Sequence, residues 1–241
     1  DYVLGPGDEI VIYIWGKAEQ TLNLTVDNEG KIVLPRVGPT YISGLTYEKV
    51  QNLIRSKLLQ EYSNLDVDVS IGKLRTITIW VFGEVRRPGA YRLSPFATPL
   101  YALWAAGGVK KTGSLRNIVI KKAKKDVEMD LYTMLIEGNR LADIRLDEGD
   151  MVFVPPIGRI AAIAGEVKRP GIYELKNEKR LGDLIELAAG ITPFAQLKRI
   201  QIMRVKGHEF KTVLDVEISE LTKELKTFKI EDGDLAIIYP L

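Results

Sequence analysis

Cysteine is absent from this sequence of 241 residues, and histidine occurs once, at position 208. The lack of cysteine excludes disulfide bonds, thiol catalysis and cysteine-ligated metal. Long apolar runs are also missing, because a stretch such as residues 77–82 is far shorter than the ~20 residues that a membrane-spanning helix needs. No signal peptide is recognisable, and we expect a chain that opens at Asp1 without methionine to be a processed or trimmed product.

Charge of either sign is not in excess, because 34 lysines and arginines are balanced by 32 aspartates and glutamates, with a net charge of +2. A nucleic-acid-binding protein would be expected to carry a dominant basic face. Composition therefore gives no case for a nucleic-acid partner. Hydrophobic residues make up 46% of the chain, which is enough to fill more than one core.

One sequence motif of 11 residues occurs twice in the chain. It reads VFGEVRRPGAY from residue 81 and IAGEVKRPGIY from residue 163, an offset of 82 residues. The same offset relates AGGV at 106–109 to AAGI at 188–191, and a final pair of segments, DEGDMVFVPP and EDGDLAIIYP, corresponds after a shift of two residues. Each copy spans roughly 80 residues, which is the size of a small domain.

The repeat divides the chain into three predicted domains, at residues 1–73, 74–157 and 158–241. In each repeat the pattern predicts two strands joined as a hairpin, a short helix that ends at the AGG-like segment, and further strands. The second repeat is also expected to form a helix after Asp215. This order is typical of a β-grasp-like module, so the predicted fold class is α+β with two tandem β-grasp-like modules.

The first domain is expected to contain a strand at 9–15 and a helix from Thr46, as N-cap, to about residue 62. A tight turn at 27–30 is expected to lead into a returning strand at 31–34. Alternating apolar residues predict one more strand at 67–71 that faces a core.

The ordered motifs resemble the polysaccharide export family, the Wza-like outer-membrane polysaccharide export proteins of Gram-negative bacteria. YVLGPGDEI at 2–10, the segment 27–38 with its GKIVLP core, GLT at 44–46 and VDVSI at 67–71 resemble the N-terminal export domain of that family. The repeats resemble its soluble-ligand-binding β-grasp (SLBB) domains. The marks of these domains are the GEVxxPG hairpin, the AGG helix end and the GD before the last strand, and together the matches cover nearly the whole chain.

The resemblance implies a periplasmic or outer-membrane-associated protein that forms a homo-oligomeric ring and conducts polysaccharide. It also implies an inner-membrane polysaccharide co-polymerase, often a tyrosine autokinase, as a partner, and a connection to the outer membrane through flanking segments or a separate pore protein. The sequence lacks the family's lipidated N-terminal cysteine and its C-terminal amphipathic pore helix. We therefore expect a trimmed chain or a short periplasmic member, and we extend the resemblance to the ring and not to pore formation.

No catalytic constellation is recognisable in the sequence, because one histidine and no cysteine leave nucleophilic catalysis without its parts. His208 lies at the tip of a predicted hairpin, where a solvated turn residue is expected. Carboxylates occur in pairs at turns and strand edges, where turn hydrogen bonding favours them. The pairs are Asp8 with Glu9, Asp66 with Asp68, Glu148 with Asp150, and Asp232 with Asp234. A glycosidase pair or a metal site among them is the weaker interpretation, so we expect no enzyme activity, no cofactor and no metal.

The tips of the repeated hairpins are the candidates for ligand binding. Arg86 and Arg87 in the first repeat, and Lys168 and Arg169 in the second, place two cations beside each Pro-Gly turn. The resemblance to ligand-binding modules favours a saccharide or anionic group at these tips, and the alternative is a solvated loop. A second basic tip at 121–125 has the same two interpretations, with a glycan or an acidic partner as the ligand.

The three tryptophans could stack on sugar rings only if they are exposed. We expect Trp15, Trp80 and Trp104 in the core or in a subunit interface, and Trp104 in the core because it lies in the middle of a predicted helix.

Two kinds of glycine recur in the repeats. Gly83 and Gly165 are expected at bulges or close-packing positions rather than in a phosphate-binding loop. Gly89 and Gly171 take the third position of the Pro-Gly turns, where a type II turn requires a positive φ.

These observations leave three hypotheses of different classes. The leading one is a non-enzymatic ring component of a capsular or exopolysaccharide export machine, which is monomeric in dilute solution and forms lateral contacts at high concentration. The second is a monomeric periplasmic glycan-binding or sensor protein that uses the two SLBB modules. A polysaccharide-modifying enzyme is the third and weakest.

Overall fold

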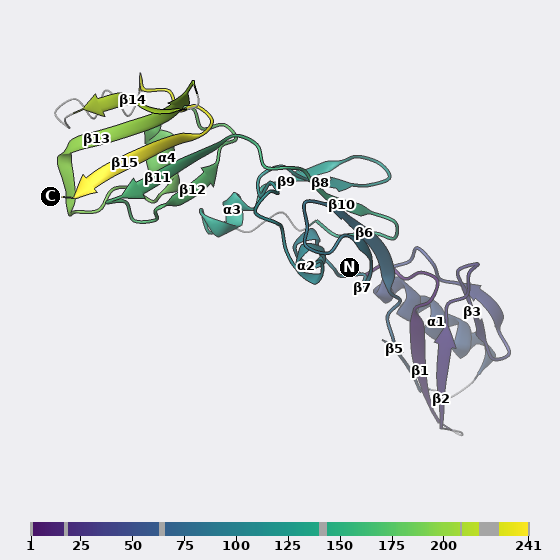
Figure 1. The fold of residues 1–241 in the computed structure, drawn as a ribbon. Helices are drawn as coiled ribbons and strands as arrows, with labels where there is room; N and C mark the ends of the chain where they lie inside the picture. Colours follow the sequence, from purple (N-terminus) through teal and green to yellow (C-terminus); the bar gives the residue numbers. More distant parts are fainter. Residues whose placement is uncertain are drawn as a thin grey trace. The chain divides into compact units, whose positions relative to one another are not determined.

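The computed structural model of the protein describes residues 2–16, 19–62, 66–139, 144–207, 209–216 and 227–240 (Figure 1). The chain divides into two compact units. Unit 1 consists of Asp1–Ile79, Ala90–Thr98 and Arg145–Gly149, and unit 2 of Trp80–Gly89, Pro99–Ile144 and Asp150–Leu241. The greater part of both repeats therefore belongs to unit 2, and the three-domain division of the sequence stays a prediction beside this organisation.

The N-terminal part of unit 1 is a three-stranded antiparallel sheet with one long helix and a separate two-stranded sheet. The elements are β1 (Glu9–Trp15), β2 (Gln20–Thr25), β3 (Lys31–Leu34), β4 (Gly38–Tyr41), α1 (Tyr47–Glu61) and β5 (Asp66–Ile71). The sheet order is β2-β1-β5, and β3 pairs with β4. Alternate residues of β1 bury Ile10, Ile12 and Ile14, and α1 packs its buried stripe into the same core.

Two details of this part differ from the prediction. The strand at 31–34 does not return along the preceding strand but pairs with β4, whereas β2, which the sequence analysis missed, pairs with β1. β2 is largely exposed, and this explains its weak apolar signal. Thr46 does occupy the N-cap of α1, but its side chain makes no capping hydrogen bond.

The first repeat forms a five-stranded mixed sheet in the order β7-β6-β10-β8-β9. Its elements are β6 (Ile77–Gly83), β7 (Gly89–Leu93), α2 (Pro99–Ala105), β8 (Ile118–Lys121), β9 (Val127–Met129), α3 (Tyr132–Leu135) and β10 (Met151–Val154). The closing strand β10 lies parallel to β6 and antiparallel to β8. Ile77, Ile79 and Val81 of β6 are buried, as are Ala102 and Leu103 of α2.

The second repeat has the same topology, with the order β12-β11-β15-β13-β14. Its elements are β11 (Ile160–Gly165), β12 (Gly171–Glu174), α4 (Leu181–Leu187), β13 (Ala195–Lys206), β14 (Glu209–Val216) and β15 (Asp234–Pro240). β15 again lies parallel to the first strand of the module, β11. The α+β class and the tandem modules are thereby confirmed, whereas the helix predicted after Asp215 and the environment of His208 lie outside the described residues.

Candidate functional site

In each repeat the GEVxxPG hairpin and the AGG-like segment are joined by backbone hydrogen bonds. In the first repeat the backbone N–H groups of Arg86 and Arg87 donate to the carbonyl oxygens of Gly108 and Ala106, at 3.1 and 2.9 Å. In the second repeat Lys168 and Arg169 donate in the same way to Gly190 and Ala188, at 3.0 Å each. The GEVxxPG hairpin therefore caps the carbonyl end of the helix that precedes the AGG-like segment, where backbone acceptors would otherwise lack partners.

The glycine of each GEV sequence is required by a close approach of two backbones. Gly83 and Gly165 have φ values of 87° and 82°. A Cβ atom at these positions would collide with the carbonyl oxygens of Val154 and Ile238, which belong to the closing strands β10 and β15. The predicted close packing is confirmed.

The type II interpretation of the Pro-Gly turns is wrong. The positive φ predicted for Gly89 is present, but at 157° it is far from the approximately +80° of a type II turn, and Gly171 has no positive φ. The physical reason is that both glycines begin strands, β7 and β12, and do not occupy the centre of a turn.

The Gly-Asp motif at the start of β1, β10 and β15 places a buried carboxylate against a cation. Asp150 pairs with Lys122 at 2.6 Å, and Asp234 pairs with Arg204 at 2.7 Å. In unit 1 Asp8 pairs with Arg75 at 2.7 Å and also accepts a hydrogen bond from Tyr2. Turn hydrogen bonding holds for Asp8 and Asp234, which accept from the backbone N–H groups three residues before them, but the interpretation missed their ion pairs. Glu148 and Asp232 instead accept backbone N–H groups from residues distant in the chain, Thr78 and Ile160.

The four predicted site residues are all exposed at the hairpin tips. The side chain of Arg87 also donates from Nη2 to the carbonyl oxygen of Ala105 at 3.2 Å. A cation at this end of a helix is favoured by the helix dipole, so part of the role of Arg87 is structural. Ligand binding by Arg86, Arg87, Lys168 and Arg169 stays a prediction.

The expected burial of the tryptophans is wrong. Trp104 is 75% exposed, and Trp15 and Trp80 are 46% and 41% exposed. The reason for Trp104 is that α2 has only seven residues and turns Pro99, Ala102 and Leu103 toward the core, which leaves position 104 on the outer face. Trp80 alternates with the buried residues of β6 and therefore lies on the other face of the sheet. A subunit interface, the other half of the prediction, remains untested.

An aromatic pair covers the outer face of α2. The rings of Tyr101 and Trp104 lie 6.1 Å apart at 76°, in an edge-to-face arrangement. By the offset of the repeat, the equivalent positions on α4 are Asp183 and Glu186. The two modules thus present different chemistry at the same place in the fold.

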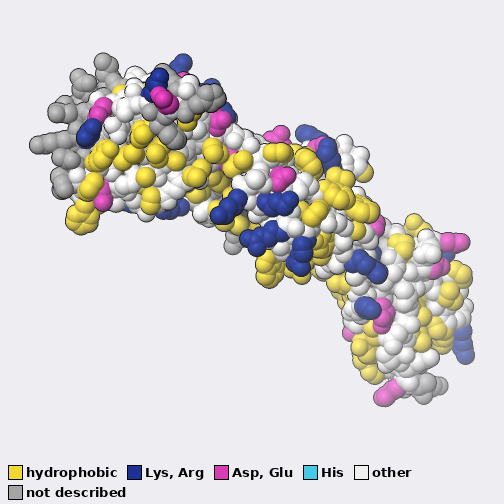
Figure 2. All heavy atoms as spheres, viewed as in Figure 1, with side chains coloured by type: hydrophobic (Ala, Val, Ile, Leu, Met, Phe, Trp, Pro, Cys, Tyr) yellow, Lys and Arg dark blue, Asp and Glu magenta, His cyan; other side chains and the backbone are white. Residues whose placement is uncertain are grey.

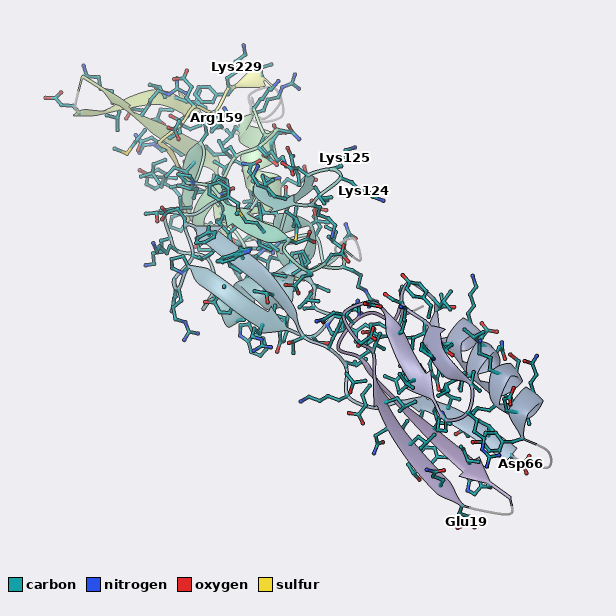
Figure 3. All side chains as sticks on the ribbon, turned by 90° about the vertical axis from the view of Figure 1, so that its right-hand side faces the viewer. Glu19, Asp66, Lys124, Lys125, Arg159 and Lys229 are labelled. Atoms are coloured by element: carbon teal, nitrogen blue, oxygen red, sulfur yellow. The ribbon has the colours of Figure 1, made fainter. Side chains whose placement is uncertain are left out.

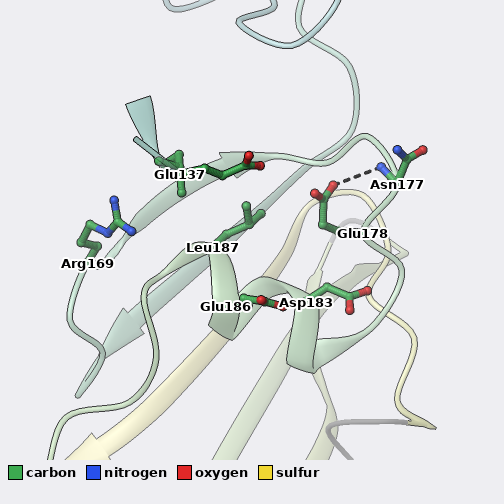
Figure 4. Close-up of a pocket in the computed structure, with 8 residues that line it drawn as sticks. Glu137, Arg169, Asn177, Glu178, Asp183, Glu186 and Leu187 are labelled. Carbon is green, nitrogen blue, oxygen red and sulfur yellow. Dashed lines mark hydrogen bonds between the residues drawn. The ribbon is translucent and has the colours of Figure 1, made fainter. Parts of the chain in front are cut away.

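At α4 this difference produces an acidic cavity of about 520 Å³ (Figure 4). Among the described residues that line it Arg169 is the one cation, and the others are Ile136, Glu137, Asn177, Glu178, Asp183, Glu186 and Leu187. In Figure 4 Asp183 and Glu186 extend from the helix, and Glu178 accepts a hydrogen bond from the backbone of Asn177 at 3.1 Å. The second predicted tip, at Arg169, therefore faces carboxylates.

The two repeats are joined by a buried network that sequence reasoning missed. The Arg116 guanidinium donates to Asp130 at 3.2 Å and to Glu178 at 2.8 Å, and it lies over the ring of Tyr132. The buried carboxylate of Glu174 accepts hydrogen bonds from Ser114 Oγ and from the backbone of Leu115, at 2.6 and 2.9 Å. Hydrophobic periodicity does not predict such a network, because its members come from segments that are distant in the chain.

The charge balance of this network shifts the pKa of two groups. Burial by itself raises the pKa of Glu178, but hydrogen bonds from the backbone of Lys176 and the guanidinium of Arg116 outweigh burial, and the pKa lies below its ordinary value of 4.5. Burial likewise opposes the charge of Arg116, and the partner carboxylates overcome it and raise the pKa of Arg116.

The second basic tip is smaller than predicted. Lys122 belongs to the buried pair with Asp150, and Lys121 lies 3.2 Å from Asp126. Lys124 and Lys125 extend from the loop between β8 and β9 (Figure 3). Only these last two residues form an exposed basic tip without carboxylate partners among the described residues.

The described part of the chain contains no group of three or more histidine, aspartate and glutamate residues placed to hold a metal ion. None of its helices is long and apolar enough to cross a bilayer.

The fold is that of an N-terminal module followed by two β-grasp-like modules, and comparison with known families assigns each. Residues 1–72 match the polysaccharide biosynthesis/export protein family, and residues 78–154 and 160–212 each match the SLBB domain. By these three matches the chain belongs to the polysaccharide biosynthesis/export protein family.

Two characterised proteins are similar over most of the chain. The polysialic acid transport protein KpsD of Escherichia coli is 31% identical over 210 residues, which cover 86% of this chain and 37% of KpsD. The EPS I polysaccharide export outer membrane protein EpsA of Ralstonia solanacearum is 26% identical over 219 residues, which cover 80% of this chain and 58% of EpsA. The matched region thus spans less than two thirds of either relative.

Proposed function

We propose that the protein is a non-enzymatic component of a capsular or exopolysaccharide export machine in the Gram-negative cell envelope, located in the periplasm or at the outer membrane. The observation that carries the proposal is the architecture of one export domain followed by two SLBB domains, shared with relatives named for polysialic acid transport and for EPS I export. The names of the two relatives describe polysaccharide transport and export.

The mechanism that we propose is confinement of a hydrated polymer inside a ring of identical subunits, since a head-to-tail contact between copies can close into a ring. An inner-membrane co-polymerase, often a tyrosine autokinase in the family, would deliver the polymer. Flanking segments or a separate pore protein would connect the ring to the outer membrane.

An apolar sheet face in the first repeat supports contact between copies. Trp80 and Phe82 are 41% and 36% exposed, and their rings stack at 5.9 Å and 11°. Met151 and Phe153 lie beside them in register on β10. In the second repeat the positions of Trp80 and Phe82 are Ala162 and Ala164, so the module folds without these aromatic rings. Apolar surface that the fold does not require is typical of an interaction surface.

The export role is tested in a strain that depends on this protein alone. Charge reversal at all four tips (R86E, R87E, K168E and R169E) is expected to reduce polymer export, because the tips are proposed to lie on the lumen or on a subunit seam. The matched control is K124E with K125E, which reverses exposed charge away from the hairpins. Wild-type export by the tip variant, with a normal melting curve, would return the four residues to the solvated-loop interpretation.

The alternative, a monomeric glycan-binding or sensor protein, is favoured by one observation, the cavity of about 520 Å³ beside α4. A cavity of this size lies within the usual range for small-molecule sites. Sedimentation velocity over a wide concentration range separates the two proposals. A chain that stays monomeric at the highest concentrations, and that is not needed for export, would favour the sensor.

A further inference from the structure

We propose that the carbonyl end of α2 is a binding site for an acidic sugar residue, and that the equivalent end of α4 is not. The inference rests on the proposed export function, because it assigns a polymer contact to one SLBB module. The sequence predicts ligand binding at the hairpin tips of both repeats, whereas this inference assigns it to the first repeat alone.

Cations gather around the end of α2. The backbones of Arg86 and Arg87 bond to the AGG-like segment, and the Nε of Arg87 lies 3.5 Å from where a Cβ of Gly107 would stand. Lys110 and Lys111 follow directly and are exposed. Figure 2 shows Lys and Arg side chains gathered over the region of α2, with hydrophobic side chains beside them.

Two cations of this cluster, Arg86 and Lys111, are not paired with a carboxylate among the described residues. Within the described residues the side chains of Arg86 and Lys111 have no hydrogen-bond or ion-pair partner, whereas Lys110 lies 3.8 Å from Glu84, which also accepts a hydrogen bond from Thr112. Arg86 is therefore available to a ligand carboxylate, which a guanidinium binds through paired, charge-assisted hydrogen bonds.

Tyr101 and Trp104 add the second element of sugar recognition. A pyranose has an apolar face of C–H groups and a polar edge, and an exposed indole ring offers a flat surface for that face. Trp104 is the more exposed of the two, at 75%. It lies one residue before Ala105, whose carbonyl oxygen accepts a hydrogen bond from the Arg87 guanidinium, so Arg87 contacts the last turn of the helix, to which Trp104 belongs.

The second repeat carries the same backbone and the opposite chemistry. At α4 the aromatic positions hold Asp183 and Glu186, and Arg169 shares its cavity with Glu137 and Glu178. A carboxylated sugar would meet like charges there, and the described residues that line the cavity include no aromatic ring. Since both modules fold with the same topology and the second has Asp183 and Glu186 in place of Tyr101 and Trp104, the aromatic pair at α2 is not demanded by the fold.

The test is a titration of the 241-residue chain, followed by tryptophan fluorescence and by calorimetry. The probe is a hexamer of galacturonic acid, and the matched control ligand is its methyl ester, which has the same rings without the charges. We expect the acid to bind and the ester to bind at least roughly tenfold more weakly, since loss of a charge-assisted contact has about that effect. Arg86→Gln and Trp104→Ala are each expected to weaken binding of the acid by a similar factor. Lys168→Gln, the same change at the equivalent position of the second repeat, is expected to leave it within about twofold.

Three results would overturn the proposal: no binding of the acid at millimolar concentration, equal binding of acid and ester, or equal losses for Arg86→Gln and Lys168→Gln. The circular dichroism spectrum and melting temperature of each variant show that a loss of binding is not a loss of fold. The outcome is independent of the export assay, because export can persist in a variant that no longer binds the isolated oligosaccharide. Failure of this inference therefore leaves the export function standing.

Discussion

Arg204 donates two hydrogen bonds to Asp234, from Nε at 2.7 Å and from Nη2 at 2.8 Å. The carboxylate of Asp234 is fully buried, and its other hydrogen bond comes from the backbone of Glu231. The pair occupies the place that Lys122 and Asp150 occupy in the first repeat. In both repeats the aspartate of the Gly-Asp motif therefore forms a buried ion pair, which connects the closing strand to the strand beside it.

Asp234→Ala is expected to lower the free energy of unfolding by about 3 kcal/mol, because removal of one partner leaves a cation at the edge of the core without its counter-charge. Urea denaturation followed by circular dichroism measures the change. The control is Asp215→Ala, which removes an exposed carboxylate paired with Arg199 and should have a small effect. Equal effects of the two substitutions would contradict a structural role for the buried pair.

The junction of the two repeats should respond to acid through Glu178. The pKa of Glu178 is lower in the folded protein than its ordinary 4.5, so its ionised form contributes stability at pH values above that ordinary value. This contribution is lost as the pH falls through the lowered pKa. We expect Glu178→Gln to melt below the wild type at pH 7, and we expect the difference to shrink below about pH 4.5. Melting temperatures measured from pH 3 to 7 test this, and a difference that does not change with pH would argue against it.

Much of the fold could be predicted from sequence because it depends on local signals. Alternating isoleucines gave β1 and β6, and the periodic apolar stripe with Thr46 gave α1. β2 was not predicted because most of its side chains are exposed, so its sequence has no continuous apolar run to indicate a strand.

The candidate site was predictable only in part, because its chemistry depends on neighbours distant in the chain. The hairpin cations Arg86 and Arg87 were found from the repeat. Trp104 was placed in the core because a mid-helix tryptophan between Leu103 and Ala105 usually packs inward. Which face of a two-turn helix lies on the sheet is decided by tertiary contacts, and the local sequence does not state it.

The close approach of strands β11 and β15 leads to a prediction for Gly165. Gly165→Ala is expected to destabilise the protein by roughly 2–3 kcal/mol or more, because the new Cβ would collide with the Ile238 carbonyl oxygen in a left-handed backbone. Gly171→Ala is the control, since a Cβ there meets only the Tyr173 ring at an ordinary 3.8 Å. Thermal melts of both variants decide the matter. A Gly171→Ala variant that is the less stable of the two would restore the importance of the Pro-Gly turn.

The aromatic sheet face of the first repeat leads to a prediction about assembly. Trp80→Ala combined with Phe82→Ala is expected to leave stability nearly unchanged, because the second repeat folds with Ala162 and Ala164 at these positions. The control Ile79→Ala removes a fully buried side chain from the opposite face of the same strand and should cost about 2–5 kcal/mol.

Self-association should respond in the opposite way. If the face of Trp80 and Phe82 is the contact between copies, the double variant should remain monomeric at concentrations where the wild type associates, because the apolar area that the contact would bury is gone. Sedimentation velocity measures this. The destabilised Ile79→Ala variant, studied well below its melting temperature, should still associate, since its outer face is unchanged. A double variant that associates like the wild type would exclude this face as the subunit contact and would direct the search to the exposed strand edges β7 and β9.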